Sequence, residues 1–144
     1  MKNLHHITVA LNFTEGEANL QKFKKMDFLK KANLRLLHLS QINDYHFIDE
    51  VDVTLYPAKE AKLILEQKVY EKLNRFREEL IRENFLGEIS CECRFTKSPK
   101  KEMCQDSDKR RVDLAVMFAS DKYFGSFIQY QLEHSTSFAL VVKS

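Results

Sequence analysis

The sequence predicts an α/β fold in which one sheet of five parallel strands lies between helices that cover both of its faces. Five short runs of β-branched and aliphatic residues alternate with longer segments of helical periodicity, as expected for repeated strand-helix-strand units. At 144 residues and 44% hydrophobic side chains, the chain is long enough to bury one continuous core. No repeat, low-complexity tract or linker interrupts it. We therefore predict a single domain over residues 1–144.

The first half of the chain predicts two strands and two helices. Ile7 to Phe13 is the first strand, and a helix follows from about Glu17 to Lys31. Leu34 to Ile42 is the second strand, and the acidic, irregular segment after it predicts a surface loop. A long helix is predicted from Pro57 to Leu86, because one of its faces is apolar at every third or fourth position. Its proline suits a first turn, and Gly87 suits a helix end.

The second half predicts three more strands and two more helices. The strands are Ile89 to Phe95, Val112 to Phe118 and Phe138 to Val142. The first of these is the weakest prediction, because its alternate residues are polar. A short, highly charged helix is predicted from Ser98 to Arg111, and it offers little apolar surface to a core. The last helix is predicted from Ser126 to His134.

Composition and charge restrict the classes of partner. The 23 Lys and Arg residues nearly balance the 21 Asp and Glu residues, so no strong field favours nucleic acid or anionic lipid. The basic stretches KSPKK and DKRR have no aromatic side chains interleaved for base stacking, and we interpret them as a solvated helix face. No apolar run approaches the roughly 18 residues of a membrane span. We expect a cytoplasmic protein that contacts neither nucleic acid nor membrane.

Histidines and acidic residues offer no metal or catalytic site at the level of sequence. His5 and His6 are neighbours in a strand, so they point to opposite faces and do not chelate one ion together. His38 lies in an apolar strand and is predicted to be a hydrogen-bonded core residue. The acidic segment from Asp44 to Asp52 lacks the ligand spacing and glycine of a calcium loop. We predict no metal.

The three cysteines are an odd number, which argues against a disulfide framework. Cys91 and Cys93 lie in a predicted strand, and we expect their side chains to diverge. A redox role with Cys104 as the resolving thiol is the alternative, but free cysteines are more often small buried hydrophobic residues. The thiols are therefore predicted to be reduced and functionally silent.

The most specific pattern lies in the carboxyl-terminal third. It combines a run in the fourth strand, a Gly-Ser pair before the last helix, and a Leu-x-His before the closing strand. The residues are Asp113, Leu114, Val116, Met117, Gly125, Ser126, Leu132 and His134. Together with ITVALNFT, LRLLHLSQI and its LLH, this order resembles the universal stress protein family over nearly the whole chain. The resemblance implies a Rossmann-like sheet in the order 3-2-1-4-5, with any ligand beyond the carboxyl ends of strands one and four.

The sequence departs from the nucleotide-binding pattern of that family. Its nucleotide-binding members carry G-x2-G-x9-G-[S/T], in which the early glycines admit phosphate close to backbone N–H groups. Here Phe118 stands at the first glycine, the second is absent, and only seven positions separate Phe118 from Gly125. Asn12 replaces the acidic residue that family members place at the end of strand one to hold the ribose. The resemblance is therefore to the branch of the family without the full glycine motif.

Two classes of function follow from the resemblance. The first is a non-enzymatic stress-response or regulatory protein that acts as a homodimer through unidentified protein partners, without ATP. The second is an ATP- or AMP-binding switch, or a slow ATP hydrolase, with Asn12, Met117, Gly125 and Ser126 around the nucleotide. We favour the first, in which Gly125 and Ser126 serve only the helix start, where Ser126 and Gln129 match a capping box. Nothing in the sequence brings a nucleophile, a base and oxyanion donors together, so we predict no enzyme.

The homodimer prediction concerns the last strand. In the order 3-2-1-4-5, Phe138 to Val142 is an edge strand that is apolar and free of proline, and such an edge invites pairing with another chain. Universal stress proteins commonly pair their last strands antiparallel across a two-fold axis, which lets one surface serve both partners. The resemblance therefore implies a dimer built on this strand.

Overall fold

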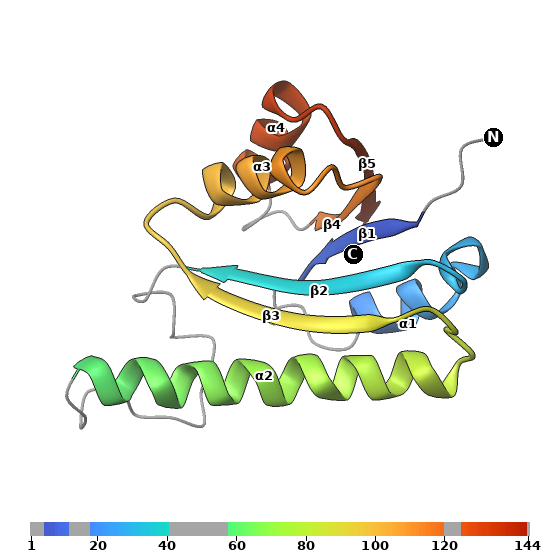
Figure 1. Ribbon diagram of the computed structural model, residues 1–144, viewed down its shortest axis with the longest axis horizontal. Coiled ribbons are helices and arrows are strands. Elements are labelled where there is room, and N and C mark those ends of the chain that lie inside the picture. The colour runs from blue at the N-terminus through green and yellow to red at the C-terminus, as the bar shows by residue number, and fades with distance from the viewer. Residues whose placement is uncertain (1–4, 12–17, 41–57, 120–124, 144) are drawn as a thin grey trace.

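The computed structural model describes residues 5–11, 18–40, 58–119 and 125–143, and these form a sheet between two layers of helices (Figure 1). The strands are β1 (His6–Ala10), β2 (Asn33–Ser40), β3 (Ile89–Phe95), β4 (Leu114–Ala119) and β5 (Phe138–Lys143). All neighbouring strands are parallel, and their order is β3-β2-β1-β4-β5. The predicted fold class and strand order are confirmed.

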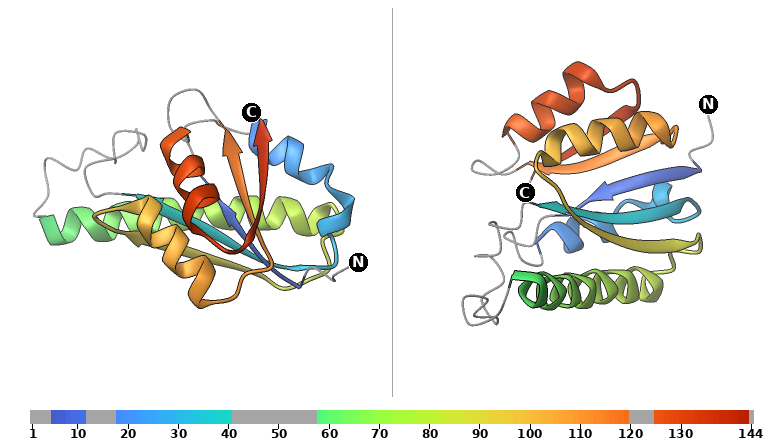
Figure 2. Two further views of the ribbon diagram at one scale, coloured as in Figure 1. Left: turned by 90° about the horizontal axis from the view of Figure 1, so that it is seen from above. Right: turned by 60° about the vertical axis from the view of Figure 1, so that its left-hand side comes forward.

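Two helical layers cover the two faces of the sheet (Figures 1 and 2). One layer holds α1 (Ala18–Lys24), the 3-10 helix η2 (Asp27–Leu29) and α2 (Ala58–Arg82). The other holds α3 (Pro99–Lys109) and α4 (Gly125–His134). None of the helices in the described part of the chain is both long and apolar enough to cross a membrane.

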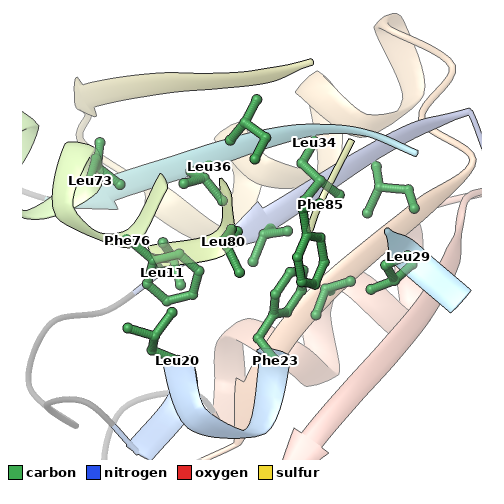
Figure 3. Packing of buried hydrophobic residues seen from close by; sticks show 14 of the residues in the cluster. Leu11, Leu20, Phe23, Leu29, Leu34, Leu36, Leu73, Phe76, Leu80 and Phe85 are labelled. Atoms are coloured by element: carbon green, nitrogen blue, oxygen red, sulfur yellow. The ribbon is translucent and has the colours of Figure 1, made fainter. Parts of the chain in front are cut away.

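The face covered by α1 and α2 carries the larger apolar core (Figure 3). Phe23 of α1 is fully buried, and its ring stacks on Phe85 with the ring centroids 5.7 Å apart. The buried residues of α2 recur along one face, as the sequence predicts. They are Leu65, Val69, Leu73, Phe76 and Leu80. This core fixes the long helix along β2 and β3.

The predicted helix from Glu17 to Lys31 is divided into two parts. After α1 ends at Lys24, the backbone N–H of Met26 donates to the Phe23 carbonyl at 3.0 Å, which tightens the turn. The chain then continues as η2. The single-helix prediction is wrong because the apolar positions on either side of this turn are buried without a continuous helix. The predicted surface loop before α2, and Pro57 itself, lie outside the described residues.

The end of α2 differs from the prediction that placed it at Gly87. Asn84 adopts a positive φ of 67°, the Phe85 N–H donates to the Leu80 carbonyl at 3.1 Å, and both Phe85 and Leu80 are in the core. This is a Schellman motif with asparagine in the left-handed position. Gly87 serves another purpose, because a Cβ there would lie 1.9 Å from the carbonyl oxygen of Ala32. Glycine is required at this position for the close approach of two chain segments.

The face covered by α3 and α4 has a smaller apolar core. Its buried members are Ala10, Leu37, Met103, Ala115 and Met117. The helix α3 contributes Met103 and Cys104, but Asp106 and Ser107 on the same helix are also buried. Polar contacts therefore hold much of this layer in place.

Candidate functional site

The carboxyl half of β4 sends its side chains into both cores. Phe118 is fully buried and packs toward α1, with its ring centroid 6.4 Å from that of Phe23. Met117 is also fully buried and packs on the opposite face, in the small core under α3 and α4. At the position where the nucleotide-binding pattern has its first glycine, this chain therefore has an aromatic core residue.

The start of α4 is exposed to solvent. A Cβ added at Gly125 would meet nothing within 4 Å, and its φ lies outside the left-handed region, so the fold does not require glycine there. Ser126 is exposed and is the second residue of α4. The capping-box prediction is wrong, because Ser126 lies inside the helix and the Gln129 amide donates to Glu133 Oε1 at 3.0 Å.

The structure describes three of the four candidate nucleotide residues. Met117 is in the core, whereas Gly125 and Ser126 lie at the exposed start of α4. Asn12 lies outside the described residues, as do residues 120–124 between β4 and α4. Whether these four residues surround a ligand stays a prediction.

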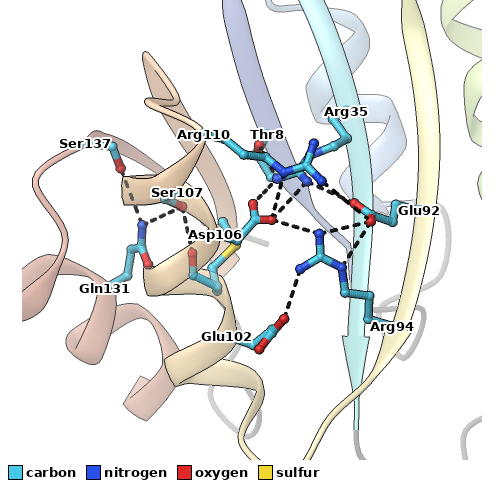
Figure 4. A network of polar contacts seen from close by, with 11 residues as sticks. Thr8, Arg35, Glu92, Arg94, Glu102, Asp106, Ser107, Arg110, Gln131 and Ser137 are labelled. Atoms are coloured by element: carbon cyan, nitrogen blue, oxygen red, sulfur yellow. Dashed lines mark hydrogen bonds and ion pairs between the residues drawn. The ribbon is translucent and has the colours of Figure 1, made fainter.

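A network of charged side chains joins α3 to the sheet (Figure 4). At its centre is Asp106 of α3, whose side chain is 3% exposed. Its Oδ1 accepts hydrogen bonds from Arg35 Nη1 at 3.1 Å, Arg94 Nη2 at 2.9 Å and Arg110 Nε at 3.1 Å. Arg35 also donates to Asp106 Oδ2 through Nη2. One carboxylate thus links β2, β3 and the end of α3.

Two further carboxylates complete this network. Glu92 of β3 accepts from Arg35 Nη1 at 2.9 Å and from Arg94 Nε at 3.0 Å. Glu102 of α3 accepts from Arg94 Nη1 at 3.0 Å, and Thr8 of β1 accepts from Arg35 Nη2 at 3.0 Å. The three arginines therefore face three carboxylates. The donors and acceptors of the network bind one another, and they hold α3 against the sheet.

The network shifts the proton affinities of its members. Burial alone would raise the pKa of Asp106, but the hydrogen bonds and charges of Arg35 and Arg94 outweigh burial and lower it. Burial opposes the charge of Arg94, yet its contacts with Glu92 and Asp106 raise the pKa of the guanidinium. Both groups are therefore held in their charged forms.

A second polar cluster ties α4 and β5 to α3. Gln131 is 2% exposed, and its Nε2 donates to Ser107 Oγ at 3.2 Å. Asp108 Oδ1 accepts from the Thr136 backbone N–H at 3.0 Å and from Ser135 Oγ at 2.9 Å. Burial would raise the pKa of Asp108, but these bonds lower it. The sequence analysis missed both polar clusters, because Asp106, Ser107 and Asp108 lie in a stretch that reads as solvated helix.

Three histidines of the described ranges have structural partners. His38 is 2% exposed, and its Nδ1 lies 2.9 Å from the Leu11 carbonyl, which confirms the prediction of a hydrogen-bonded core residue. The backbone N–H groups of His5 and His6 donate to Asp113 Oδ2 at 3.1 and 3.0 Å. Across the ranges that the structure describes, no three His, Cys, Asp or Glu side chains are grouped to hold a metal ion.

The prediction that Cys91 and Cys93 diverge is wrong. Residues two apart in a strand share a face, and both thiols pack against the core under α2. Burial raises the pKa of Cys91, and burial together with the charge of Glu66 raises the pKa of Cys93 to about 12. Cys104 is buried, and burial raises the pKa of its thiol as well. Raised pKa values oppose the thiolate character that redox sensors need.

One hollow in the described part of the chain lies at the opposite end of the sheet from the expected nucleotide position. It has a volume of about 700 Å³ and lies at the amino ends of β1, β2 and β3, with Thr8, Arg35, Ser90, Arg77 and Arg110 among its lining residues. The Arg35 guanidinium turns its Nη atoms to Thr8, to Glu92 and to Asp106 of the network. We therefore do not assign a ligand to this hollow.

Comparison with known proteins places the fold in a class. No protein-family model matches the sequence, and a search of curated proteins gives no match. Solved structures do match. The structure of the hypothetical protein MJ0577 matches with 20% sequence identity and a TM-score of 0.71, and the match covers 98% of this chain and 97% of that protein's chain. The parallel order with helices on both faces defines a Rossmann-like α/β protein.

Two further solved structures carry the name of a particular family. A universal stress protein family protein from Arabidopsis thaliana, with AMP bound, has 13% identity and a TM-score of 0.62, over 96% of this chain and 91% of its own. The universal stress protein from Archaeoglobus fulgidus in complex with dAMP has 12% identity and a TM-score of 0.60, over 99% of this chain and 100% of its own. This chain has the fold of the universal stress proteins, as the sequence resemblance implied.

Proposed function

We propose that this chain is a universal stress protein that acts as a non-enzymatic regulatory homodimer and does not hold ATP through the loop between β4 and α4. The observation that carries the proposal is the burial of Phe118 against Phe23. A phosphate-binding loop needs glycine at this position so that backbone N–H groups converge on the oxygens. In this chain the position holds an aromatic side chain that packs in the core, so the end of β4 lacks the glycine that such a loop needs.

The second half of the proposal concerns β5. Phe138 is 68% exposed and Val141 is 39% exposed, so the last strand presents apolar side chains to solvent. Among the described residues, the backbone of β5 has a side-chain hydrogen-bond partner only at its last residue, where Lys22 Nζ donates to the Lys143 carbonyl. Exposed apolar side chains beside an open backbone edge favour pairing with a second copy of the same strand. The partner proteins and a cytoplasmic location belong to this proposal, and the three free cysteines are consistent with such a reducing compartment.

A nucleotide-binding switch is the second candidate, because solved proteins of this fold are bound to AMP, dAMP or cAMP. The exposed amino end of α4 supports it, since the first N–H groups of a helix have no partner within the helix and the helix dipole favours anions there. In this alternative, Gly125 and Ser126 would lie beside the phosphates, and Asn12 and Met117 near the nucleoside.

Calorimetry with Mg-ATP and with AMP separates the two candidates. We expect no binding of micromolar or tighter affinity, and native mass spectrometry should find no nucleotide retained by the purified protein. If binding does occur, Ser126→Ala should weaken it, and an unchanged affinity would remove Ser126 from the site. Gln129→Ala is the matched control, since Gln129 lies one turn further along α4.

A further inference from the structure

The strand β3 forms the second open edge of the sheet. The Leu34 N–H donates to the Glu88 carbonyl at 2.8 Å, and Leu34 lies opposite Ile89. In a parallel ladder, this pairing turns the even-numbered residues of β3 toward β2. The N–H and carbonyl groups of the odd-numbered residues therefore point away from the sheet. They belong to Ile89, Cys91, Cys93 and Phe95.

One of these outward groups already has a partner. The backbone N–H of Cys93 donates to the hydroxyl oxygen of Tyr70 at 3.2 Å. Tyr70 lies on α2, which runs alongside β3, and its half-buried ring packs against the main core (Figure 1). The core thus holds the hydroxyl at the middle of the edge. A strand that adds to this edge must displace it, because both compete for the same N–H group.

Charged side chains of α2 lie within electrostatic range of the same strand. Lys62 and Glu66 of α2 act electrostatically on the thiol of Cys93, and Arg77 of α2 acts on that of Cys91. A strand that pairs here would bring its own side chains against these charges and remove water from them. Desolvated charges disfavour such pairing, and natural proteins use charged residues to protect edge strands.

We propose that Tyr70 closes the β3 edge to strand addition, so that association through β5 stops at two chains. The limit of two chains rests on the proposed homodimer. If both edges were open, dimers would add to one another without limit. The closing contact itself depends only on Tyr70, Cys93 and the packing of α2. Tyr70 is thus a residue that specifies which edge accepts a second chain.

The test compares Tyr70→Phe with the unmodified protein. Phenylalanine keeps the ring in the core and removes only the hydroxyl. Amide hydrogen exchange resolved at Cys93 should become at least tenfold faster in Tyr70→Phe, and analytical ultracentrifugation from 1 to 500 µM should show species larger than a dimer, in a concentration-dependent manner. Tyr130→Phe is the matched control, because the Tyr130 hydroxyl bonds to no described residue. It should change neither measurement.

A second substitution tests whether the larger species form by pairing at the β3 edge or only because the protein has lost stability. Cys93→Pro in the Tyr70→Phe background removes the outward N–H itself, which an edge strand tolerates, and should return the protein to the association state of the parent. The proposal is overturned if exchange at Cys93 is unchanged, or if exchange quickens while Tyr70→Phe still forms nothing larger than the parent. If the parent is a monomer, the β5 dimer fails, and the same comparison still decides the role of Tyr70, because new self-association must then appear only in Tyr70→Phe.

Discussion

The two edges of the sheet have the same backbone geometry but different surroundings. At β5 the exposed side chains are apolar, with Phe138 and Val141 prominent. At β3 the hydroxyl of Tyr70 accepts a hydrogen bond from the N–H of Cys93, and charged side chains of α2 act electrostatically on the thiol of the same residue. The order of the strands does not by itself distinguish the two edges. In our proposal, the helix beside each edge decides which edge pairs with another chain.

Helix length accounts for this difference. The 25 residues of α2 span about 37 Å, whereas the seven residues of β3 span about 23 Å, so the helix reaches past the whole strand. The ten residues of α4 span only about 15 Å, and β5 is about 20 Å long. A helix shorter than its strand covers only part of the length of that strand on its own face of the sheet. Figure 2 shows α2 extending along the sheet much further than α4.

The largest expected difference between the two edges comes from placing a proline in each of them in turn. Val141→Pro removes a backbone donor from β5 and should give monomers or insoluble protein. Cys91→Pro places the same residue in β3, where the lost N–H points away from the sheet, and should leave the association state unchanged. Light scattering of both variants makes the comparison. Equal behaviour of the two variants would show that the edges are not distinct.

The next effect concerns the network that holds α3 over β3. Asp106→Ala leaves three guanidiniums around an empty centre and should lower the free energy of unfolding by roughly 3 kcal/mol, as for a broken buried ion pair. Glu102→Ala removes an ion pair whose glutamate is 34% exposed and should cost less than about 1 kcal/mol. Urea unfolding measures both. A smaller loss for Asp106→Ala than for Glu102→Ala would contradict the central position of Asp106.

Acid should destabilise the same layer. The folded chain holds the pKa of Asp106 and of Asp108 below that of an unfolded aspartate, so the folded state binds fewer protons. Their stabilising contribution is therefore complete above pH ~4, the ordinary aspartate range, and is lost as the pH falls through the folded pKa values. The free energy of unfolding should drop between about pH 4 and 2, and the drop should be smaller in Asp106→Ala. A flat profile in the unmodified protein would exclude this contribution.

The smallest expected effect concerns the thiols of the β3 edge. With its pKa raised to about 12, Cys93 should react with iodoacetamide about a thousandfold more slowly than a free cysteine at pH 8, from the thiolate fraction alone. The variant that combines Cys91→Ser, Cys93→Ser and Cys104→Ser should fold and associate like the parent in reducing and oxidising buffers. If peroxide changes the association state of the parent and not of this variant, a redox role replaces the silent one.

Periodicity predicted the parts of this structure that depend on apolar side chains. The five strands, the strand order implied by the family resemblance and the buried face of α2 are all present. The helix end at Asn84 was missed because asparagine occurs in many conformations, and nothing else in the sequence indicates that this one is left-handed. Gly87 was assigned to that end, although its role is to admit Ala32.

The polar layer was missed for a different reason. Arg35, Glu92 and Arg94 are strand residues that read as interruptions of an apolar pattern, and Asp106 lies in a highly charged helix. Only the strand register brings them together, since Leu37 lies opposite Glu92 and Leu39 opposite Arg94. Alternating polar residues in β3 were the available signal, because they mark one face of a strand that a polar helix covers. Of the candidate site, the sequence placed Gly125 and Ser126 at the start of α4, but it did not reveal that Met117 is a core residue.

The mass of the unmodified protein in solution tests the central claim most directly. Light scattering at micromolar concentration should report twice the 17.0 kDa of the chain, with no change on adding Mg-ATP or AMP. Because the contact is apolar, the same mass should persist in high salt. A mass of 17.0 kDa under these conditions would contradict pairing through β5.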